Sequence, residues 1–199
     1  IVAMESEIRR AGAVPATIAV SDGQIIVGLD DSEKFAFSQM AFPKISSRDL
    51  GPALASGKPS VTTVSATLLA AELAGIHFLA SAGLGGVHRG AESSFDISSD
   101  LVQLTRSPVV AVTAGAKTIL DLGLTLEFLE THCVPCVSFQ FDDFPAFYVR
   151  ESGFRSPCRM DSLAEIAKAI ILHNQIGRGG FLVTTPTRVE DAIDRDLVE

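Results

Sequence analysis

Short apolar runs alternate along this chain with segments in which apolar residues recur every three or four positions. The first pattern predicts β-strands and the second predicts amphipathic helices. We expect strands at 17–20, 24–29, 76–80, 109–113, 134–140 and 180–184, and helices at 3–11, 61–74, 99–105, 118–130, 161–175 and 189–198. This alternation is typical of an α/β fold with a largely parallel mixed sheet flanked by helices. The length of 199 residues predicts one domain over 1–199.

The segments between these elements predict a hairpin turn and the loops where a ligand would bind. The turn 21–23, Ser-Asp-Gly, predicts a hairpin between the first two strands. Open parallel sheets bind ligands beyond the carboxyl ends of their strands. The glycine-rich loop 81–90 and the tetrapeptide 114–117 both fall there, so we expect the functional site at these two loops.

Composition narrows the kind of ligand. The formal net charge is -8 and no run of basic residues exceeds two, which favours a small molecule over a nucleic acid. Three cysteines are too few for a disulfide scaffold, so we expect a cytoplasmic setting, with an organelle as the alternative. The most apolar stretch, 64–86, contains Glu72 and His77 and predicts a buried helix and strand, not a membrane span.

The loop 81–90 has the composition of an anion site. Its glycines let several backbone N–H groups approach one anion, while His88 and Arg89 add a titratable donor and a positive charge. A phosphate or a carboxylate would fit, although neither the dinucleotide fingerprint nor the P-loop pattern is met. The alternative is a tight turn with a surface His–Arg pair.

The next segment is rich in carboxylates and hydroxyls. Asp96 and Asp100 would share a face if the segment were helical, and such oxygen ligands suit Mg²⁺ or Mn²⁺. The alternative is helix capping by Ser98 or Ser99 with acidic residues in the first turn.

Lys117 stands between an apolar strand and a predicted amphipathic helix. A lysine close to a low-dielectric core loses its proton more readily, and the free amine can attack the carbonyl of an opened sugar to form a Schiff base. The alternative is a first-turn lysine whose ammonium reaches solvent, which the helix dipole disfavours. Lys44 lies in a second segment, 42–50, that is dense in phosphate-type donors or, alternatively, is a solvated loop.

Cys133 and Cys136 form a C-x-x-C pair, which is typical of thiol exchange or of half a metal site. The pair leads into a strand and not into a helix, and Cys158 stands apart. We expect two buried, unreactive thiols, and a thiol redox protein is the alternative from another functional class.

Six segments together resemble the pseudouridine-5'-phosphate glycosidase family, first described as indigoidine-synthase-A-like. They occur in the family's order across nearly the whole chain. They are GAVPATIA (12–19), KISSRDL (44–50), GGVHRGAE (85–92), FDISSDL (95–101), AGAKTILD (114–121) and FPAF (144–147).

The resemblance implies an enzyme that reversibly cleaves the carbon–carbon glycosidic bond of pseudouridine 5'-phosphate to give uracil and ribose 5-phosphate. It implies that Lys117 is the Schiff-base nucleophile at C1' of the sugar and that Asp96 binds Mn²⁺ (or Mg²⁺). It also implies a homo-oligomer, a trimer by resemblance, with no nucleic acid and no membrane as partner. The positions that match the family's substrate contacts, or lie in its glycine loop, are Lys44, Val64, His88, Ser98, Ser99 and Asp100.

The chain departs from the family at its ends. The family's catalytic acid is a glutamate in a Glu-Ser-Thr-Ile segment, and Glu5 looks similar, but its spacing to 12–15 places it on a later helix. We therefore expect the chain to begin after the acid and to end before an active-site asparagine of the family. A general acid typically contributes ~10²–10⁴-fold. The alternative to an active glycosidase is thus a catalytically impaired sugar-phosphate-binding homologue or pseudoenzyme subunit.

Overall fold

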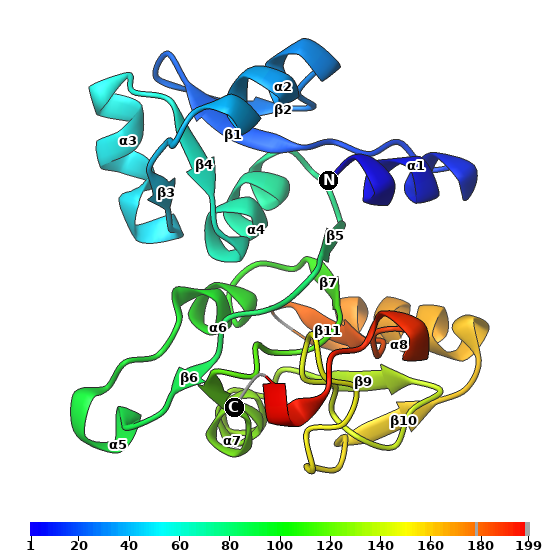
Figure 1. Cartoon of the computed structure of the whole chain (residues 1–199). Coiled ribbons are helices and arrows are strands. Elements are labelled where there is room, and N and C mark those ends of the chain that lie inside the picture. The colour runs from blue at the N-terminus through cyan, green and yellow to red at the C-terminus, as the bar shows by residue number, and fades with distance from the viewer. Residues whose placement is uncertain (178, 198–199) are drawn as a thin grey trace.

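The computed structural model describes residues 1–177 and 179–197, and within these ranges the strands form one five-stranded, one four-stranded and one two-stranded sheet. The two larger sheets occupy the lower and upper halves of the molecule (Figure 1). The predicted α/β fold with a parallel sheet is confirmed, although its strands are divided between sheets and not collected in one.

The five-stranded sheet is parallel throughout, in the order β10-β9-β11-β7-β5. Its strands are β5 (Phe78–Ser81), β7 (Val110–Thr113), β9 (Cys136–Phe139), β10 (Cys158–Met160) and β11 (Phe181–Thr184). Because successive side chains of a strand point to opposite faces, Val110 and Ala111 belong to different apolar clusters. Helices therefore cover both faces of this sheet.

Helix α8 (Leu163–Ile176) covers one face through Ile166 and Ile170, which pack with Val110 and Val183. The opposite face is covered by α4 (Val64–Leu73), α6 (Ser99–Leu104) and α7 (Leu122–Thr131). The result is a helix–sheet–helix sandwich with its largest apolar cluster on the α4, α6 and α7 side.

The four-stranded sheet has the order β2-β1-β4-β3. It contains β1 (Ile18–Ser21), β2 (Gln24–Val27), β3 (Lys44–Ile45) and β4 (Ser60–Thr62), with α1 (Val2–Arg10), α2 (Asp31–Gln39) and α3 (Leu50–Ser56) beside it (Figure 1). The predicted hairpin is confirmed, since β1 and β2 pair antiparallel around Gly23 at φ 74°. Ala66 of α4 packs with Val20 of this sheet, whereas Leu68 packs with the lower one, so α4 joins the two halves.

Several predicted boundaries were wrong. The helix expected at 61–74 begins only at Val64, because 60–62 pairs as β4 and Thr63 caps the helix. The helix expected at 118–130 begins at Leu122, where the Asp121 side chain accepts the N–H of Leu124. The segment 189–198 forms two 3₁₀ turns, η2 (Val189–Asp191) and η3 (Arg195–Leu197), and position 198 lies outside the described residues.

Several short elements were missed, among them α2, α3 and β10. Helices α2 and α3 and strand β10 are short and carry weak periodicity. A readable signal did exist for α2, since Asp30 and Glu33 form a reciprocal capping box. The apolar stretch 64–86 folds as α4 and then β5, as predicted, and among the described residues no helix is long and apolar enough to cross a membrane.

Glu5 is a buried carboxylate of the upper half, with 5% of its surface exposed. Its Oε2 accepts from Lys34 Nζ at 2.6 Å and from Arg9 Nη2 at 3.1 Å, and its Oε1 accepts from the Thr17 hydroxyl. The hydrogen bond from Lys34 is the largest cause, followed by that from Thr17, of a lowering of the pKa of Glu5 from 4.5 to about 2. Glu5 thus ties α1 to β1 and α2 and is ionised at neutral pH.

We expect Glu5→Gln to lower the free energy of unfolding at pH 7 by about 2 kcal/mol, as for a charge-assisted hydrogen bond. Because the folded-state pKa lies below the ordinary 4.5, this stabilisation is fully present above pH 4.5 and is lost as pH falls toward 2. Urea unfolding over that range should show the two proteins converging.

Glu7→Gln is the matched control, since the Glu7–Arg10 pair lies on the same helix with Glu7 61% exposed. It should leave unfolding nearly unchanged because exposed pairs contribute little. Equal effects of the two substitutions would contradict the role assigned to Glu5.

Candidate active site

The two loops singled out from the sequence lie side by side at the carboxyl ends of β5 and β7. Ser81 pairs with Thr113, so the chain leaves both strands at one edge of the sheet. The loops then bond to each other: Leu84 N–H donates to Gly115 O at 2.9 Å, and Lys117 N–H donates to Leu84 O at 3.2 Å. The predicted placement of Lys117 beside the glycine loop is confirmed.

Asp100 anchors the glycine loop from the other side. This residue is only 6% exposed. Its Oδ1 accepts the N–H of Ser65 at 2.8 Å, and its Oδ2 accepts the N–H of Gly85 at 2.9 Å. A Cβ on Gly85 would lie 2.2 Å from Ser98 Oγ, so only glycine allows this approach. One carboxylate therefore joins the N-terminus of α4 to the loop that carries Leu84.

A group of hydroxyls surrounds the same helix terminus. Ser65 is fully buried, and its Oγ lies 3.0 Å from Ser99 Oγ and 2.8 Å from Thr63 Oγ1. The same oxygen accepts the N–H of Ser47 at 3.1 Å, at the start of η1 (Ser47–Asp49). Ser99 is half-buried and Ser98 caps α6 by accepting the N–H of Asp100. Ser65 was not predicted, because a serine at the start of a helix is usually explained by capping.

Backbone hydrogen bonds place Lys44 and Val64 beside this cluster. Lys44 is exposed on β3 and pairs with Val61, and the N–H of Thr63 donates to Ile45 O at 2.9 Å. Val64 begins α4 and packs half-buried against the main apolar cluster. The structure thus brings Lys44, Val64 and 98–100 together at the N-terminus of α4.

Lys117 sits on a rigid loop. Gly115 has φ 90°, and a Cβ there would lie 1.7 Å from Pro145 O. The N–H of Phe147 donates to Ala114 O at 2.8 Å, so the segment 144–147 braces the loop opposite the glycine loop. Lys117 is half-buried, and within the described residues its side chain makes no hydrogen bond or ion pair. The prediction that Lys117 stands at the start of a helix was wrong, since α7 begins five residues later at Leu122.

His88 and Asp96 face each other at the base of the arm 88–97. His88 lies on β6 (Val87–His88), which pairs with β8 (Leu120–Asp121), and the arm carries α5 (Ala91–Ser94). His88 Nδ1 is 3.7 Å from Asp96 Oδ2. The alternative reading, helix capping by Ser98 with an acidic residue in the first turn, is confirmed. Helix α6 begins at Ser99, and Asp96 is exposed outside it while Asp100 is buried. Among the described residues no three His, Cys, Asp or Glu side chains form a metal-binding group.

The prediction that both cysteines of the pair are buried is confirmed for Cys136 and wrong for Cys133. Cys136 is buried at the start of β9, and burial, with a smaller effect of Cys158, raises the pKa of its thiol to about 12. Cys133 is exposed, with φ 55°, and not buried as expected. A thiol that remains protonated at neutral pH is a poor nucleophile, which argues against the redox alternative.

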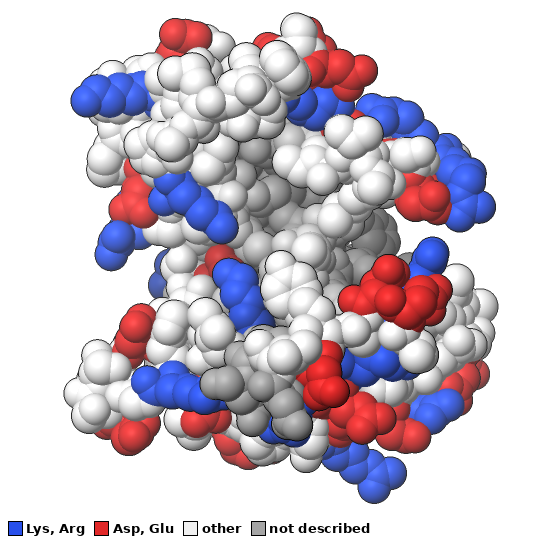
Figure 2. Space-filling view, viewed as in Figure 1, with Lys and Arg blue, Asp and Glu red and all other residues white. Residues whose placement is uncertain are grey.

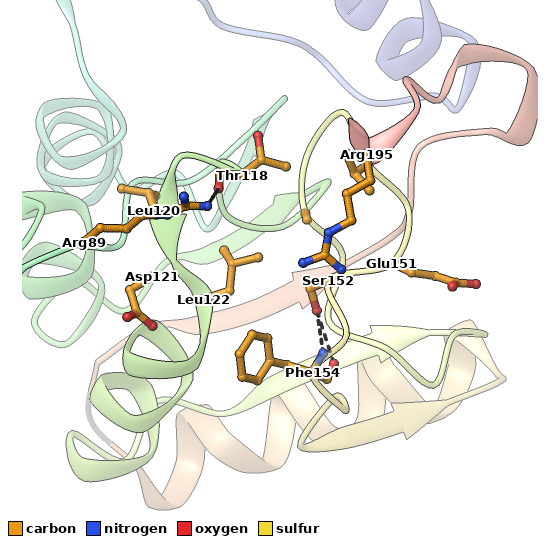
Figure 3. Close-up of a pocket in the computed structure, with 11 residues that line it drawn as sticks. Arg89, Thr118, Leu120, Asp121, Leu122, Glu151, Ser152, Phe154 and Arg195 are labelled. Carbon is orange, nitrogen blue, oxygen red and sulfur yellow. Dashed lines mark hydrogen bonds between the residues drawn. The ribbon is translucent and has the colours of Figure 1, made fainter. Parts of the chain in front are cut away.

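A pocket of about 220 Å³ lies against the turn that follows Lys117. Arg89 and Arg195 approach its mouth from opposite sides, above Leu122 and Phe154 (Figure 3). Arg89 donates to Thr118 O at 3.2 Å, so the pocket backs onto the turn of Lys117 but does not include that lysine or Asp100. We place the site at the hydrogen-bonded loops, because the chemically capable groups converge there. In Figure 2 the molecule is hollowed between its two halves, and charges of both signs are scattered over the face shown.

The candidate site thus consists of a parallel α/β sheet, an anchored glycine loop and a lysine at the carboxyl edge whose side chain has no partner among the described residues. The family model described as "Indigoidine synthase A like protein" matches residues 1–199. The chain belongs to this family.

Curated relatives are named pseudouridine-5'-phosphate glycosidase. One from Photorhabdus laumondii is 56% identical over 98% of this chain and 62% of its own length. Another from Dickeya dadantii is 54% identical over 98% of this chain and 63% of its own length. The chain thus spans a little under two thirds of the length of these relatives.

Two solved structures have the same fold. The prealnumycin C-glycosynthase AlnA, in complex with ribulose 5-phosphate, matches with TM-score 0.91 and 46% identity over 98% of this chain and 65% of its own. An indigoidine synthase A-like protein from Thermotoga maritima matches with TM-score 0.89 and 33% identity, over 98% of this chain and 66% of its own. One of these two relatives therefore binds a pentose phosphate.

Proposed function

We propose that this protein acts as a pseudouridine-5'-phosphate glycosidase through a Schiff base on Lys117. The observation that carries the proposal is the half-buried amine of Lys117, which has no partner in the described part of the chain. It lies on a loop held between the glycine loop and segment 144–147. The names of the curated relatives and the pentose phosphate bound to AlnA support the substrate class.

The reaction needs a nucleophile and a proton. The nitrogen of Lys117 bonds to C1' as the C1'–O4' bond breaks and O4' takes up a proton, which opens the sugar ring. The nitrogen then forms an imine with C1' as the bond between C1' and C5 of uracil breaks and a proton is delivered to C5. Water then hydrolyses the imine, which releases ribose 5-phosphate and restores the amine. A rigid loop favours this step because it holds the amine in place before the substrate binds.

We assign the sugar phosphate to the cluster at the N-terminus of α4. Backbone N–H groups and a helix N-terminus favour an anion, and Lys44 adds a positive charge on the adjacent strand. The residues proposed to contact the substrate are Lys44, Val64, His88, Ser98, Ser99 and Asp100. The carboxylate of Asp100 also accepts the N–H groups of Ser65 and Gly85, so it fixes the positions of the helix and the loop beside the proposed contacts.

We also propose that Asp96 holds Mn²⁺ or Mg²⁺. Asp96 offers one carboxylate, and 65% of its side chain is exposed. Such a carboxylate fits a cation that retains most of its bound water molecules. When bound, the cation supplies positive charge beside an anionic ligand. His88 lies within 3.7 Å of the same carboxylate and can position it.

Association of copies into a homo-oligomer, a trimer in the family, is part of the same proposal. Large apolar side chains are exposed on the arm 88–97 and on the turn after Lys117, where Phe95 is 83% and Ile119 62% exposed. Apolar surface of this kind favours protein contacts.

A second candidate is a sugar-phosphate-binding protein without turnover. Glu5, which superficially resembles the family's acid segment, does not supply the acid that turnover needs. Glu5 is bonded to Lys34, Arg9 and Thr17, and its pKa of about 2 leaves it no proton to donate at neutral pH. Uracil release separates the candidates, since both bind ribose 5-phosphate but only the enzyme cleaves pseudouridine 5'-phosphate.

Borohydride reduction in the presence of ribose 5-phosphate tests the nucleophile. Reduction of an imine leaves a stable secondary amine, so peptide mass spectrometry should locate one sugar adduct on Lys117. Lys117→Arg should abolish the adduct because a guanidinium does not form the imine.

Lys168→Arg is the control, since Lys168 is exposed on α8 on the opposite face of the sheet. It should retain the adduct in full. An unmodified Lys117 under trapping conditions would overturn the Schiff-base proposal.

Titration with Mn²⁺, followed by the electron paramagnetic resonance signal of the free ion, tests the cation site. We expect Asp96→Asn to weaken Mn²⁺ binding at least roughly tenfold, because loss of a charged oxygen ligand removes the main attraction. Asp22→Asn, in an exposed hairpin turn where asparagine tolerates φ 51°, should bind as the wild type does. Equal affinity of the Asp96 variant would refute the assignment.

A further inference from the structure

Ser65 is a buried hydroxyl whose neighbours point to a role in ligand binding. It is fully buried, yet three polar groups surround its oxygen: the N–H of Ser47 at 3.1 Å, Thr63 Oγ1 at 2.8 Å and Ser99 Oγ at 3.0 Å. Residues of η1, of the N-terminus of α4 and of α6 therefore all contact this one oxygen atom.

Counting donors fixes the direction of these hydrogen bonds. A serine hydroxyl has one proton and two acceptor lone pairs. The N–H of Ser47 uses one lone pair of Ser65, so Ser65 accepts from one neighbouring hydroxyl and donates to the other.

The two directions differ in which half-buried hydroxyl, that of Thr63 or that of Ser99, keeps a free proton. Thr63 Oγ1 already accepts the N–H of Ala66 at 3.4 Å as the cap of α4. If Thr63 also accepted from Ser65, its proton would have no acceptor among the described residues. Donation from Thr63 to Ser65, and from Ser65 to Ser99, uses the proton of Thr63 and leaves the proton of Ser99 free instead.

We propose that Ser65 is a positioning residue that makes Ser99 a hydrogen-bond donor to the anionic group of the ligand. Ser99 accepts from Ser65, so its own proton is left to point away from the buried cluster. Ser99 is half-buried, and within the described residues Ser65 is its one hydroxyl partner. A phosphate oxygen would form the strongest hydrogen bond with this proton, because charge-assisted hydrogen bonds are stronger than neutral ones.

The location of the cluster supports an anionic acceptor. Lys44 lies on β3, three residues before Ser47, and the N-terminus of α4 contributes its positive dipole end. This inference rests on the proposed function, since the anionic group is taken to be the phosphate of the sugar. The inference adds Ser65 to the proposed site, although Ser65 is fully buried and does not itself contact the ligand.

A double-mutant cycle measured by calorimetry with ribose 5-phosphate tests the coupling. We expect Ser65→Ala to raise the Kd roughly tenfold, the scale of one hydrogen bond to a charged group. Ser99→Ala should raise it by a similar factor. In the Ser99→Ala background, Ser65→Ala should have little further effect, because the proton that it orients is gone.

Two further variants guard against a purely structural effect. Ser60→Ala removes another buried hydroxyl, which bonds to Lys58 O away from the cluster, and should leave the Kd unchanged. Ser65→Cys keeps a side-chain atom at the buried position but donates and accepts weakly, so it should weaken binding even if Ser65→Ala fails to fold.

The outcomes separate the inference from the function on which it rests. If the wild type binds ribose 5-phosphate and neither Ser65 variant changes the Kd, the role of Ser65 is overturned while the proposed function stands. Additive losses in the cycle would also overturn it. If the wild type does not bind ribose 5-phosphate, the proposed function falls and this inference with it.

Discussion

Asp100 accepts the N–H of Ser65 through one carboxylate oxygen and the N–H of Gly85 through the other. A carboxylate that is 6% exposed needs such partners, because burial of an unpaired charge is costly. Ser65 begins the helix that joins the two halves of the molecule, and Gly85 lies on the loop bonded to the loop of Lys117. The position of Lys117 relative to the hydroxyl groups around Ser65 therefore depends on this one side chain.

Close backbone contacts complete the arrangement. Gly85 is pressed against Ser98, and Gly115 against Pro145, at distances that no side chain would permit. These contacts, with the hydrogen bonds between loops, leave the amine of Lys117 on a backbone with little freedom. An active site benefits from such preorganisation because less order has to be imposed when the substrate binds.

The sequence predicted the parts of the site that follow from strand pattern. The strands before the glycine loop and before Lys117 were recognisable as apolar runs, and their parallel pairing places both loops at one edge. The contacts among loops were not predictable, because they join residues such as Ser65 and Asp100 that are far apart in the chain. Asp96 and Asp100 do not share a helical face, since the left-handed φ of 55° at Phe95 and the cap at Ser98 end any helix between them. The start of α7 was misjudged because 120–121 pairs with β6 before the helix begins.

Amide hydrogen exchange, followed by nuclear magnetic resonance in the wild type and in Asp100→Asn, tests the role of Asp100 most directly. Asparagine keeps the shape of the side chain but replaces one acceptor oxygen with a donor. The account predicts that the amides of Ser65 and Gly85 are protected in the wild type. At least one of them should exchange roughly tenfold faster or more in the variant, because loss of about 1.4 kcal/mol is a tenfold change in the opening equilibrium. The amide of Val183, in the centre of the sheet, should be unchanged. Equal protection of Ser65 and Gly85 in both proteins would contradict the claim that the Asp100 carboxylate holds the site together.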